Sequence, residues 1–535
     1  MNGKRILAAL LIFTTGVWMA CSTQPKKKKP VVQDTTINIR TSYNNLFLDS
    51  NIVKNFLLSH GQFDSFHAQY LDFYKQRNYE FAWFDSSGIA EQTRNFYNML
   101  GPAIETLQDS GLYNKSIEKL YTLFTADTVH PKTKAQMIEA ELSFTGQFFT
   151  YAAKMYKGSD MDVSELGWFI PRKKVDLTAI LDSTILNKGN PVNVPLNSQY
   201  NKLQTYLQKY YDLRKIYPVD TLSMNVKKIQ KGDSSLLVKE IQQRLFLLGD
   251  LEDPDTTGVF DTSFLTAVKR FQERMGLTID GVIGQKVIDE LNVPINTRIQ
   301  QILVNLERVR WLPAEKDSIY MVVNIPEYRL HVFQDGEQTF SMRVIVGTAA
   351  NGTVVFNGNL KYIVFSPYWN VPTSIVKNEI VPGIQKNPNY IAEHNMEITG
   401  NNAGLPVVRQ KPGGTNSLGL VKFLFPNTYD IYLHDTPNRD LFNSSNRSFS
   451  HGCIRVGNPV KLAEFLLRND TAWTSQKIDS AMHMDKEKWV TLQQSVPVFI
   501  VYLTAWIDQE NKLNFRKDIY GHDAKMADKL FVRKW

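Results

Sequence analysis

Apolar residues recur at helical spacing through residues 41–225. Leu57, Phe63 and Tyr70 follow one another at intervals built from steps of three and four residues, and aromatic residues gather around Trp83. Residues at this spacing share one face of an amphipathic helix. We therefore predict an α-helical scaffold domain over 41–225, with an aromatic core rather than a cofactor site.

Residues 226–292 repeat a short turn followed by a helical pattern. Val238 and Leu245 lie on one apolar face that ends at Gly249, and the turns at Gly258 and Gly281 each precede a further helix. A stretch of this length is small for an independent core. The pattern predicts a packed module of three helices.

From residue 318 the apolar residues alternate with polar ones, as in half-buried strands. Strands are expected over 320–324, 362–365, 429–434 and 498–504, with Pro497 just before the last. Asp335-Gly336 separates two further alternating runs and predicts a hairpin turn. The pattern indicates a β-rich domain over 318–535 that includes a helix beginning at Asn458-Pro459.

The N-terminus has the form of an export signal. Lys4 and Arg5 precede a mostly apolar run, too short to span a bilayer comfortably, that ends at Ala20-Cys21. We expect a signal peptide over 1–20, lipidation of Cys21 and a lipidated tether over 21–40. An ordinary signal or an uncleaved anchor is the alternative. Either way the protein is exported, and we expect it to be lipid-anchored at the periplasmic face of a bacterial membrane.

Composition narrows the function classes. The chain has 535 residues, of which 43% are hydrophobic and 12% aromatic, so it is not mainly disordered. It has two cysteines, which excludes a disulfide scaffold and a four-cysteine zinc site. The formal charge of +8 is spread along the chain and does not indicate a nucleic-acid partner. No metal, cofactor or oligomer is predicted; a monomer is expected.

The strongest chemical signal surrounds Cys453. It follows His451 and Gly452 and precedes Arg455, so we expect neighbouring positive groups to lower the thiol pKa and favour the thiolate. Gly452 lets backbone N–H groups approach a substrate carbonyl, as an oxyanion hole requires. His434, at the end of a predicted strand, is the candidate general base.

These residues carry a family resemblance. His434, a spacer, then Ser450-His451-Gly452-Cys453 and Arg455 resemble the active-site motif of the L,D-transpeptidase catalytic domain family. Residues 366–383 and 502–521 resemble its large multi-domain members, and residues 226–292 resemble a peptidoglycan-binding domain. The implied fold is a helical scaffold, a peptidoglycan-binding domain and a β-rich catalytic domain with an inserted lid.

The resemblance also implies the chemistry. Cys453 would attack a tetrapeptide stem of peptidoglycan after its third residue and expel D-Ala. The stem amine of an acceptor would then complete a 3→3 cross-link. His434 would act as the base, with Ser450, His451 and Gly452 shaping the site and its oxyanion N–H groups. The remaining assignments are substrate binding by Arg455, Tyr432, Trp369 and Tyr368, and orientation of His434 by Asp435.

Several assignments have alternatives. Arg455 fits either a substrate carboxylate or an internal ion pair, and Tyr432 fits either a pocket wall or core packing. Residues 367–420 are long for a connection and predict a lid over the cysteine. The family's Gly-x-x-x-x-x-Thr-Pro run lacks its proline at 347–354, which leaves that loop's shape open.

Two other functions remain open. The same thiol could serve a carboxypeptidase or hydrolase, in which water replaces the acceptor amine. Alternatively, the chain is a non-catalytic lipoprotein that binds peptidoglycan stem peptides and glycan through residues 226–292, although modules of this kind also serve as spacers. A second family of cysteine peptidases also acts on cell walls, and in its members the cysteine precedes the histidine in the chain. Here His434 precedes Cys453, which counts against that family.

Overall fold

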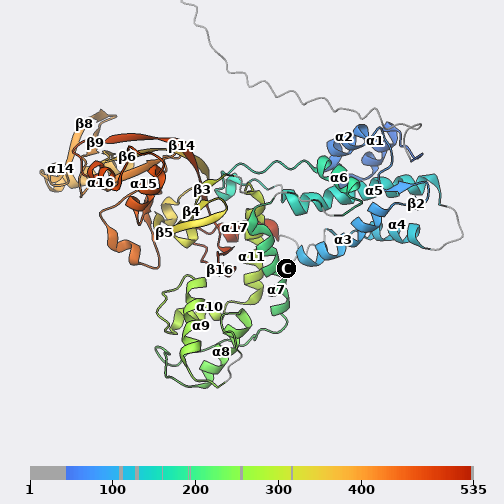
Figure 1. The fold of residues 1–535 in the computed structure, drawn as a ribbon, viewed down its shortest axis with the longest axis horizontal. Coiled ribbons are helices and arrows are strands. Elements are labelled where there is room, and N and C mark those ends of the chain that lie inside the picture. The colour runs from blue at the N-terminus through green and yellow to red at the C-terminus, as the bar shows by residue number, and fades with distance from the viewer. Residues whose placement is uncertain are drawn as a thin grey trace, which may run out of the picture.

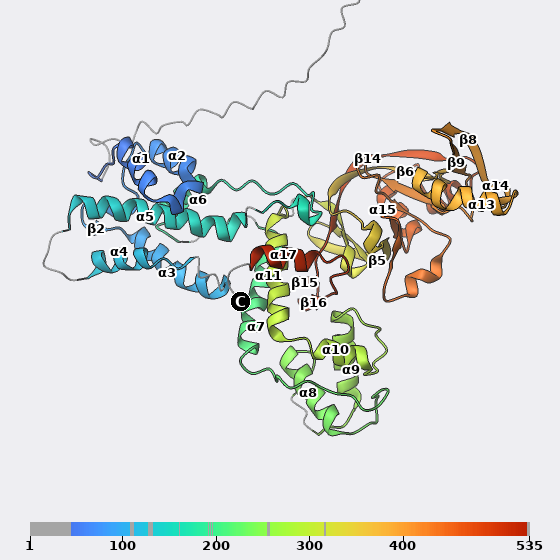
Figure 2. The ribbon, with the colours of Figure 1, turned by 180° about the vertical axis from the view of Figure 1, so that it is seen from behind.

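The computed structural model describes residues 44–531 except 108–111, 127–131, 160, 191, 193, 195, 254–256 and 315–316. The signal peptide, Cys21 and the tether lie outside these residues. A helical scaffold lies at one end of the molecule, a β-rich domain at the other, and a three-helix module beneath them (Figures 1 and 2). Among the described helices, none is both long enough and apolar enough to cross a bilayer.

The scaffold is helical, as predicted. Its elements are α1 (Ser50–Ser59), η1 (Gly61–Phe66), α2 (His67–Gln76), β1 (Phe84–Asp85), β2 (Gly88–Ile89), α3 (Glu91–Leu107), α4 (Lys115–Thr125), α5 (Lys134–Ala152), η3 (Ala153–Lys157), η4 (Ser164–Leu166) and α6 (Leu177–Leu186). Its core is aromatic and includes the fully buried Trp83. The buried Glu141 carboxylate accepts hydrogen bonds from the N–H groups of Ala82 (2.7 Å) and Trp83 (2.9 Å), which ties α5 to the chain after α2.

The module consists of α8 (Leu236–Leu248), α9 (Thr262–Arg274) and α10 (Gln285–Leu291). Side chains before the first two helices cap them: Ser235 Oγ accepts from Val238 N–H (3.2 Å), and Asp261 accepts from Phe264 N–H (2.8 Å). The three-helix prediction is therefore confirmed. The apolar faces of these helices join the same hydrophobic core as the β-rich domain.

The β-rich domain is built on a nine-stranded sheet. Its order is β12-β5-β13-β11-β10-β6-β14-β3-β4, and a further pairing of β4 with β5 closes the order on itself. The strands are β3 (Ile319–Asn324), β4 (Arg329–Gln334), β5 (Glu337–Gly347), β6 (Asn357–Phe365), β10 (Val421–Leu424), β11 (Leu433–His434), β12 (Ser448–Ser450), β13 (Ile454–Val456) and β14 (Lys488–Val501). Alternate residues fill the interior or face outward, as the period-two pattern predicts.

Two local predictions have different outcomes. The hairpin at Asp335-Gly336 is confirmed: both residues have positive φ (52° and 86°), the conformation of a tight two-residue turn. The position of Pro497 is wrong. It lies inside β14 rather than before it, next to an irregularity in the β14–β6 register between Thr491 and Val496. Such an irregularity tolerates a residue without an N–H group.

Residues 366–420 form a substructure of their own at the outer end of the β-rich domain (Figure 1). A small core under its sheet contains Val371, Val376 and Val408. Its elements are β7 (Trp369–Asn370), α12 (Thr373–Ile375), η7 (Val376–Ile380), α13 (Val381–Lys386), α14 (Tyr390–Glu393), β8 (Met396–Asn402) and β9 (Leu405–Gln410), with strand order β7-β9-β8.

Helix α11 (Ile295–Trp311) runs through the centre, beside α7 (Ser198–Leu213) (Figure 2). Asn305 Nδ2 donates to Thr504 Oγ1 (2.7 Å) in the C-terminal segment, and Glu307 accepts from Ser159 N–H (2.6 Å) in the scaffold. One helix therefore contacts the scaffold and the β-rich domain. The remaining elements are η5 (Ile325–Glu327), η6 (Ala349–Asn351), η8 (Arg439–Asn443), α15 (Pro459–Leu467), α16 (Ser475–Met482), β15 (Ala505–Ile507), β16 (Leu513–Phe515) and α17 (His522–Leu530).

Candidate active site

Strand register gathers the predicted residues on the outer face of the closed sheet. Strands β11 and β13 are parallel, with His434 opposite Arg455, and Ile454 N–H donates to the Tyr432 carbonyl (3.1 Å). Residues two apart in a strand face the same side, so Tyr432, His434, Cys453 and Arg455 share this face. From the strand rise and spacing, His434 and Cys453 lie about 8 Å apart between Cα atoms. Each side chain is hydrogen-bonded to another residue, His434 to Asp435 and Cys453 to Asp430.

Cys453 is a half-buried free thiol. Its Sγ–H donates to the Asp430 carbonyl (3.5 Å). Burial raises the pKa of the Cys453 thiol, and hydrogen bonding to Tyr432 and the charge of Arg455 oppose this only in part. The prediction of a lowered thiol pKa is therefore wrong. Arg455 lies close by, but removing the thiol from water outweighs that charge.

His434 is buried, and its ring is held by backbone. Its Nδ1 donates to the carbonyl oxygen of Asp435 (2.6 Å). Burial, followed by the charge of Arg455, lowers the pKa of His434 to about 3. The imidazole is therefore neutral at pH 7, with Nδ1 protonated towards Asp435, and the backbone of Leu418 also interacts with the ring. In the resting state a neutral base shares the face with a neutral thiol.

The Asp435 carboxylate does not reach His434. It accepts from Leu420 N–H (2.9 Å) and pairs with Arg439. The carboxylate thus secures the chain before β10, while the main-chain oxygen of the same residue holds the ring. The geometry does not place the Asp435 side chain in the orienting position that the sequence suggested.

The turn before Cys453 is tightly braced. Ser450 Oγ donates to the Cys453 carbonyl (2.6 Å) and accepts from Gly452 N–H (3.1 Å). Gly452 has φ of 118°, a conformation that other residues rarely adopt. Because Gly452 N–H is already engaged and Cys453 N–H has no bond to a described residue, Cys453 N–H is the available oxyanion donor.

Thr353 supports this turn, and the sequence reasoning did not assign it a role. Its Oγ1 donates to the Gly452 carbonyl (2.8 Å) and accepts from Gly347 N–H (2.9 Å). Gly347 and Thr353 are the glycine and threonine of the Gly-x-x-x-x-x-Thr-Pro run. Their hydrogen bond closes this loop although the proline is missing. Asp430, whose carbonyl meets the thiol, was also missed; its positive φ of 54° gave no signal in the sequence.

The other predicted residues divide between the two structural parts. Tyr432 is half-buried, and burial followed by the neighbouring Cys453 raises the pKa of its hydroxyl. Arg455 is partly buried; its Nε has no hydrogen-bond partner, and it makes no ion pair among the described residues. Tyr368 and Trp369 belong to the inserted substructure, where Arg409 stacks on Tyr368 at 4.1 Å from the ring centre.

His451 links the turn to the insertion. Its Nε2 lies 3.8 Å from the carboxylate of Glu379 on η7, and both side chains are more than half exposed. The inserted substructure therefore approaches the residue two positions before Cys453. Exposed pairs of this kind contribute little to stability.

Comparisons with known proteins match three parts of the chain. Residues 318–479 match an L,D-transpeptidase catalytic domain, residues 68–207 a scaffold domain and residues 234–291 a peptidoglycan-binding domain. A Haemophilus influenzae protein named "Putative L,D-transpeptidase" is 36% identical over 242 residues, which span 42% of this chain and 49% of that protein. The chain thus spans about half the length of this curated relative.

Solved structures provide further similar chains. An L,D-transpeptidase from Stackebrandtia nassauensis has 16% identity and a TM-score of 0.22, and the match covers 52% of this chain and 97% of that chain. An L,D-transpeptidase from Mycobacterium smegmatis has 12% identity and a TM-score of 0.19, covering 34% of this chain and 58% of that chain.

Proposed function

The chain carries an L,D-transpeptidase catalytic domain, a peptidoglycan-binding domain and a scaffold domain, and we propose that it forms 3→3 cross-links in peptidoglycan through Cys453. The observation that carries the proposal is the shared outer face of His434 and Cys453, with a neutral imidazole held through Nδ1 by the Asp435 carbonyl. A base and a nucleophile in this relation suit acyl transfer.

Acylation would begin from the neutral pair. As Sγ attacks the carbonyl after the third stem residue, the thiol proton moves to His434 Nε2 and the S–C bond forms. The carbonyl oxygen becomes an oxyanion, which Cys453 N–H can stabilise by about 3–4 kcal/mol. The C–N bond to D-Ala then breaks, and His434 returns the proton to the leaving amine. A thioester remains on Cys453.

The second half-reaction would use the same groups in reverse. The side-chain amine of an acceptor stem attacks the thioester, and His434 takes a proton from it. The new amide forms, and the thiolate leaves and is reprotonated. Water in place of the amine would give the carboxypeptidase reaction, so the acceptor decides the outcome rather than the thiol.

Product analysis tests this proposal. Purified protein and its Cys453→Ala variant are incubated with a disaccharide-tetrapeptide, and the products are identified by mass spectrometry. Cross-linked dimers that need Cys453 support the transpeptidase. Free tripeptide without dimers indicates the hydrolase, and no turnover together with wall binding indicates the non-catalytic lipoprotein.

The inserted residues 367–420 are proposed to form a lid over Cys453. The approach of Glu379 to His451 and the separate small core support a unit that covers the site and moves as one body. Replacing 367–420 with a short Gly-Ser linker should change the rate of carbapenem acylation and the choice of stem. Unchanged rate and choice would contradict the lid.

Localisation follows the substrate. A chain that binds and cross-links peptidoglycan works outside the cytoplasm, so we propose an exported protein anchored through a lipid on Cys21. Incorporation of labelled palmitate that is lost in Cys21→Ala would support the anchor. A mature protein that begins after another cleavage site would contradict it.

A further inference from the structure

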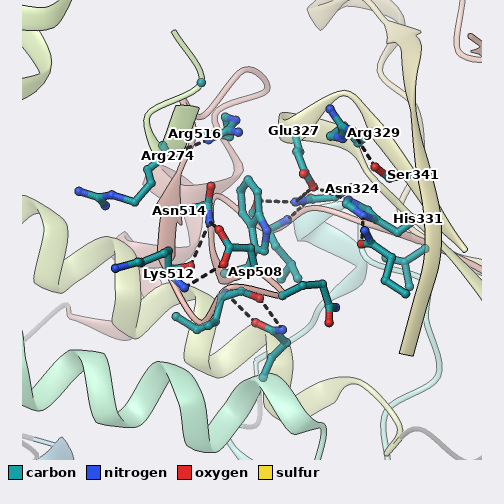
Figure 3. A pocket seen from close by; sticks show the side chains of 18 of the residues that line it. Arg274, Asn324, Glu327, Arg329, His331, Ser341, Asp508, Lys512, Asn514 and Arg516 are labelled. Atoms are coloured by element: carbon teal, nitrogen blue, oxygen red, sulfur yellow. Dashed lines mark hydrogen bonds and ion pairs between the residues drawn. The ribbon is translucent and has the colours of Figure 1, made fainter. Parts of the chain in front are cut away.

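A large cavity lies away from Cys453, between the peptidoglycan-binding module and the outer face of β3, β4 and β5. Its volume is about 1170 Å³, and neither Cys453 nor His434 lines it. The chain around the end of α9 forms one wall, and the β15–β16 hairpin contributes Asp508 and Asn514 (Figure 3). The cavity therefore brings together two parts of the chain that match different domains.

Six arginines line the cavity, and two of them, Arg270 and Arg274, pair with Glu252 and Asp250. The other four are Arg329 and Arg343 on the sheet, Arg447 just before β12 and Arg516 just after β16. Among the described residues, each donates only to neutral oxygen atoms. Arg329 Nη2 donates to Ser341 Oγ (2.6 Å), Arg343 Nη1 to the Phe442 carbonyl (3.2 Å) and Arg516 Nη1 to the Arg274 carbonyl (2.7 Å). Arg447 donates to main-chain carbonyls. In the part of the chain that the structure describes, these four guanidinium groups therefore make no ion pair.

Glu327, the carboxylate on this wall, is already engaged. It accepts from His331 Nε2 (2.9 Å), and both side chains are largely buried (Figure 3). Burial opposes its ionisation, but His331 and then Arg516 and Arg329 hold the pKa of Glu327 below its ordinary value. Glu273 and Glu290 also attract Arg516. Among the described residues, neither Arg343 nor Arg447 forms an ion pair with a carboxylate.

The arrangement places like charges close together. Arg329 and Arg343 are direct partners in the antiparallel β4–β5 pair, and like charges directly opposite each other destabilise a sheet. Burial lowers the pKa of Arg447 to about 10, and the charges of Arg343 and Arg329 add to the effect. A bound anion would relieve this repulsion, and planar guanidinium groups suit carboxylates in particular.

We propose that this cavity is a second peptidoglycan-binding site, which holds the carboxylates of a peptide stem against Arg329 and Arg343. The module that forms the opposite wall matches a peptidoglycan-binding domain. That wall also carries Glu273, which makes no ion pair among the described residues. A stem peptide with carboxylates and a free amine fits a cavity with both signs of charge, whereas a uniformly anionic polymer meets repulsion at Glu273.

The proposal rests on the proposed function for the identity of the ligand, so binding and catalysis are measured separately. Binding of a disaccharide-tetrapeptide is measured by calorimetry with the full chain carrying Cys453→Ala, which prevents turnover. The same probe with amidated carboxylates is compared. Carbapenem acylation is measured in chains that retain Cys453.

Arg329→Gln and Arg343→Gln should each weaken binding of the free-carboxylate probe about tenfold, because each removes a charge-assisted contact. Binding of the amidated probe should change less than twofold. Arg94→Gln, an exposed charge on α3, is the matched control and should leave both affinities unchanged. Acylation of Cys453 should stay at the wild-type rate, and Arg329→Lys should retain part of the binding.

Equal affinity of the Arg329→Gln chain and the Arg94→Gln control would overturn the proposal. Tighter binding of a poly(glycerol phosphate) probe than of the stem peptide would also overturn it, because the cavity would then select phosphate. A chain that binds the probe through Arg329 but is not acylated by a carbapenem would contradict the proposed function alone.

Discussion

The outer face of the closed sheet carries two polar regions that differ in charge. In the first region, the neutral region, Cys453 and His434 are themselves neutral, because burial raises the pKa of the thiol and lowers that of His434, and Arg455 beside them is the charged group. In the cavity, the guanidinium groups of Arg329 and Arg343 lie opposite each other on neighbouring strands. Strand β5 connects the two regions, since Ile345 opposes Arg455 while Arg343, two residues earlier, faces the cavity.

The difference therefore comes from what covers the sheet. His434 is buried beneath the chain around Leu418 and Leu420, whereas Arg343 is exposed. The Cys453 thiol and the His434 imidazole are both neutral before reaction. A proton can therefore pass from sulfur to nitrogen as the sulfur attacks, and no ion pair has to form beforehand. The exposed Arg343 is accessible to a charged ligand. Under the two proposals, one sheet would carry both a reaction site and a binding site.

The largest effect is expected from Cys453→Ala, which removes the nucleophile. Carbapenem acylation, followed as a mass increase of the intact protein, should fall by about a thousandfold or more. Binding of the disaccharide-tetrapeptide in the cavity should remain, because Cys453 does not line it. Persistent acylation would mean that another residue is the nucleophile, and loss of binding would mean that the two regions are one site.

Gly452→Ala should disturb the turn before Cys453 and leave the arginines of the cavity unchanged. The φ of 118° strains any residue with a Cβ by about 1–3 kcal/mol. We expect acylation to slow about tenfold or the melting temperature to fall. Gly400→Ala is the control, because Gly400 lacks positive φ and an added Cβ meets nothing within 4 Å. Equal behaviour of the two variants would show that the turn geometry is unimportant.

Acid should destabilise the neutral region through His434. Its pKa falls from 6.5 in the unfolded chain to about 3 in the folded one, so below pH 6.5 the unfolded chain binds more protons. The free energy of unfolding should therefore decrease as pH falls from about 6.5 towards 3, by up to about 1.4 kcal/mol per pH unit. Urea unfolding at pH 7 and pH 5 should show a smaller loss in His434→Gln.

The pKa of His522 is also lowered by burial, to about 4, and it acts in the same direction. It is present in both chains, so its contribution cancels in the comparison. An identical acid loss in His434→Gln would contradict a buried neutral imidazole at residue 434.

The smallest effect concerns the empty cavity. Arg343→Gln removes one partner of the opposed pair with Arg329, so the ligand-free protein should be as stable as the wild type or more stable by about 0.2–1 kcal/mol. Urea unfolding measures this change. A loss of more than about 1 kcal/mol would show that Arg343 stabilises the fold, and the charges would then need no ligand to explain them.

Local rules account for much of the fold. The helical scaffold, the three helices of the module and the hairpin at Asp335-Gly336 follow from apolar spacing and turn residues, which act over a few positions. The helix at Asn458-Pro459 also begins as predicted, with the Asn458 side chain accepting from Lys461 N–H (3.1 Å). Pro497 was misplaced because a strand irregularity depends on its partner strand, which sequence spacing does not reveal.

The site was only partly predictable. The motif pointed to Cys453 and His434 as candidates, but the state of the thiol was not predicted, because it depends on burial and on Tyr432 and Asp430, which lie just before β11. The group that orients the His434 ring is the main-chain carbonyl oxygen of Asp435. Every residue has such an oxygen, so the sequence alone cannot identify it. Arg329 and Arg447 are far apart in the sequence. Strands β4 and β5 and the connection after η8 bring them to the same cavity, so no local sequence pattern predicts it.

Helix α11 has a consequence for the reach of the protein. Asn305 secures the C-terminal segment, Glu307 secures the scaffold, and Arg298 pairs with Glu290 at the end of the module (2.6 Å). One helix thus sets the separation between the module and the β-rich domain that carries Cys453. Under the proposed function, the protein would join only those peptide stems whose distance apart matches this fixed span.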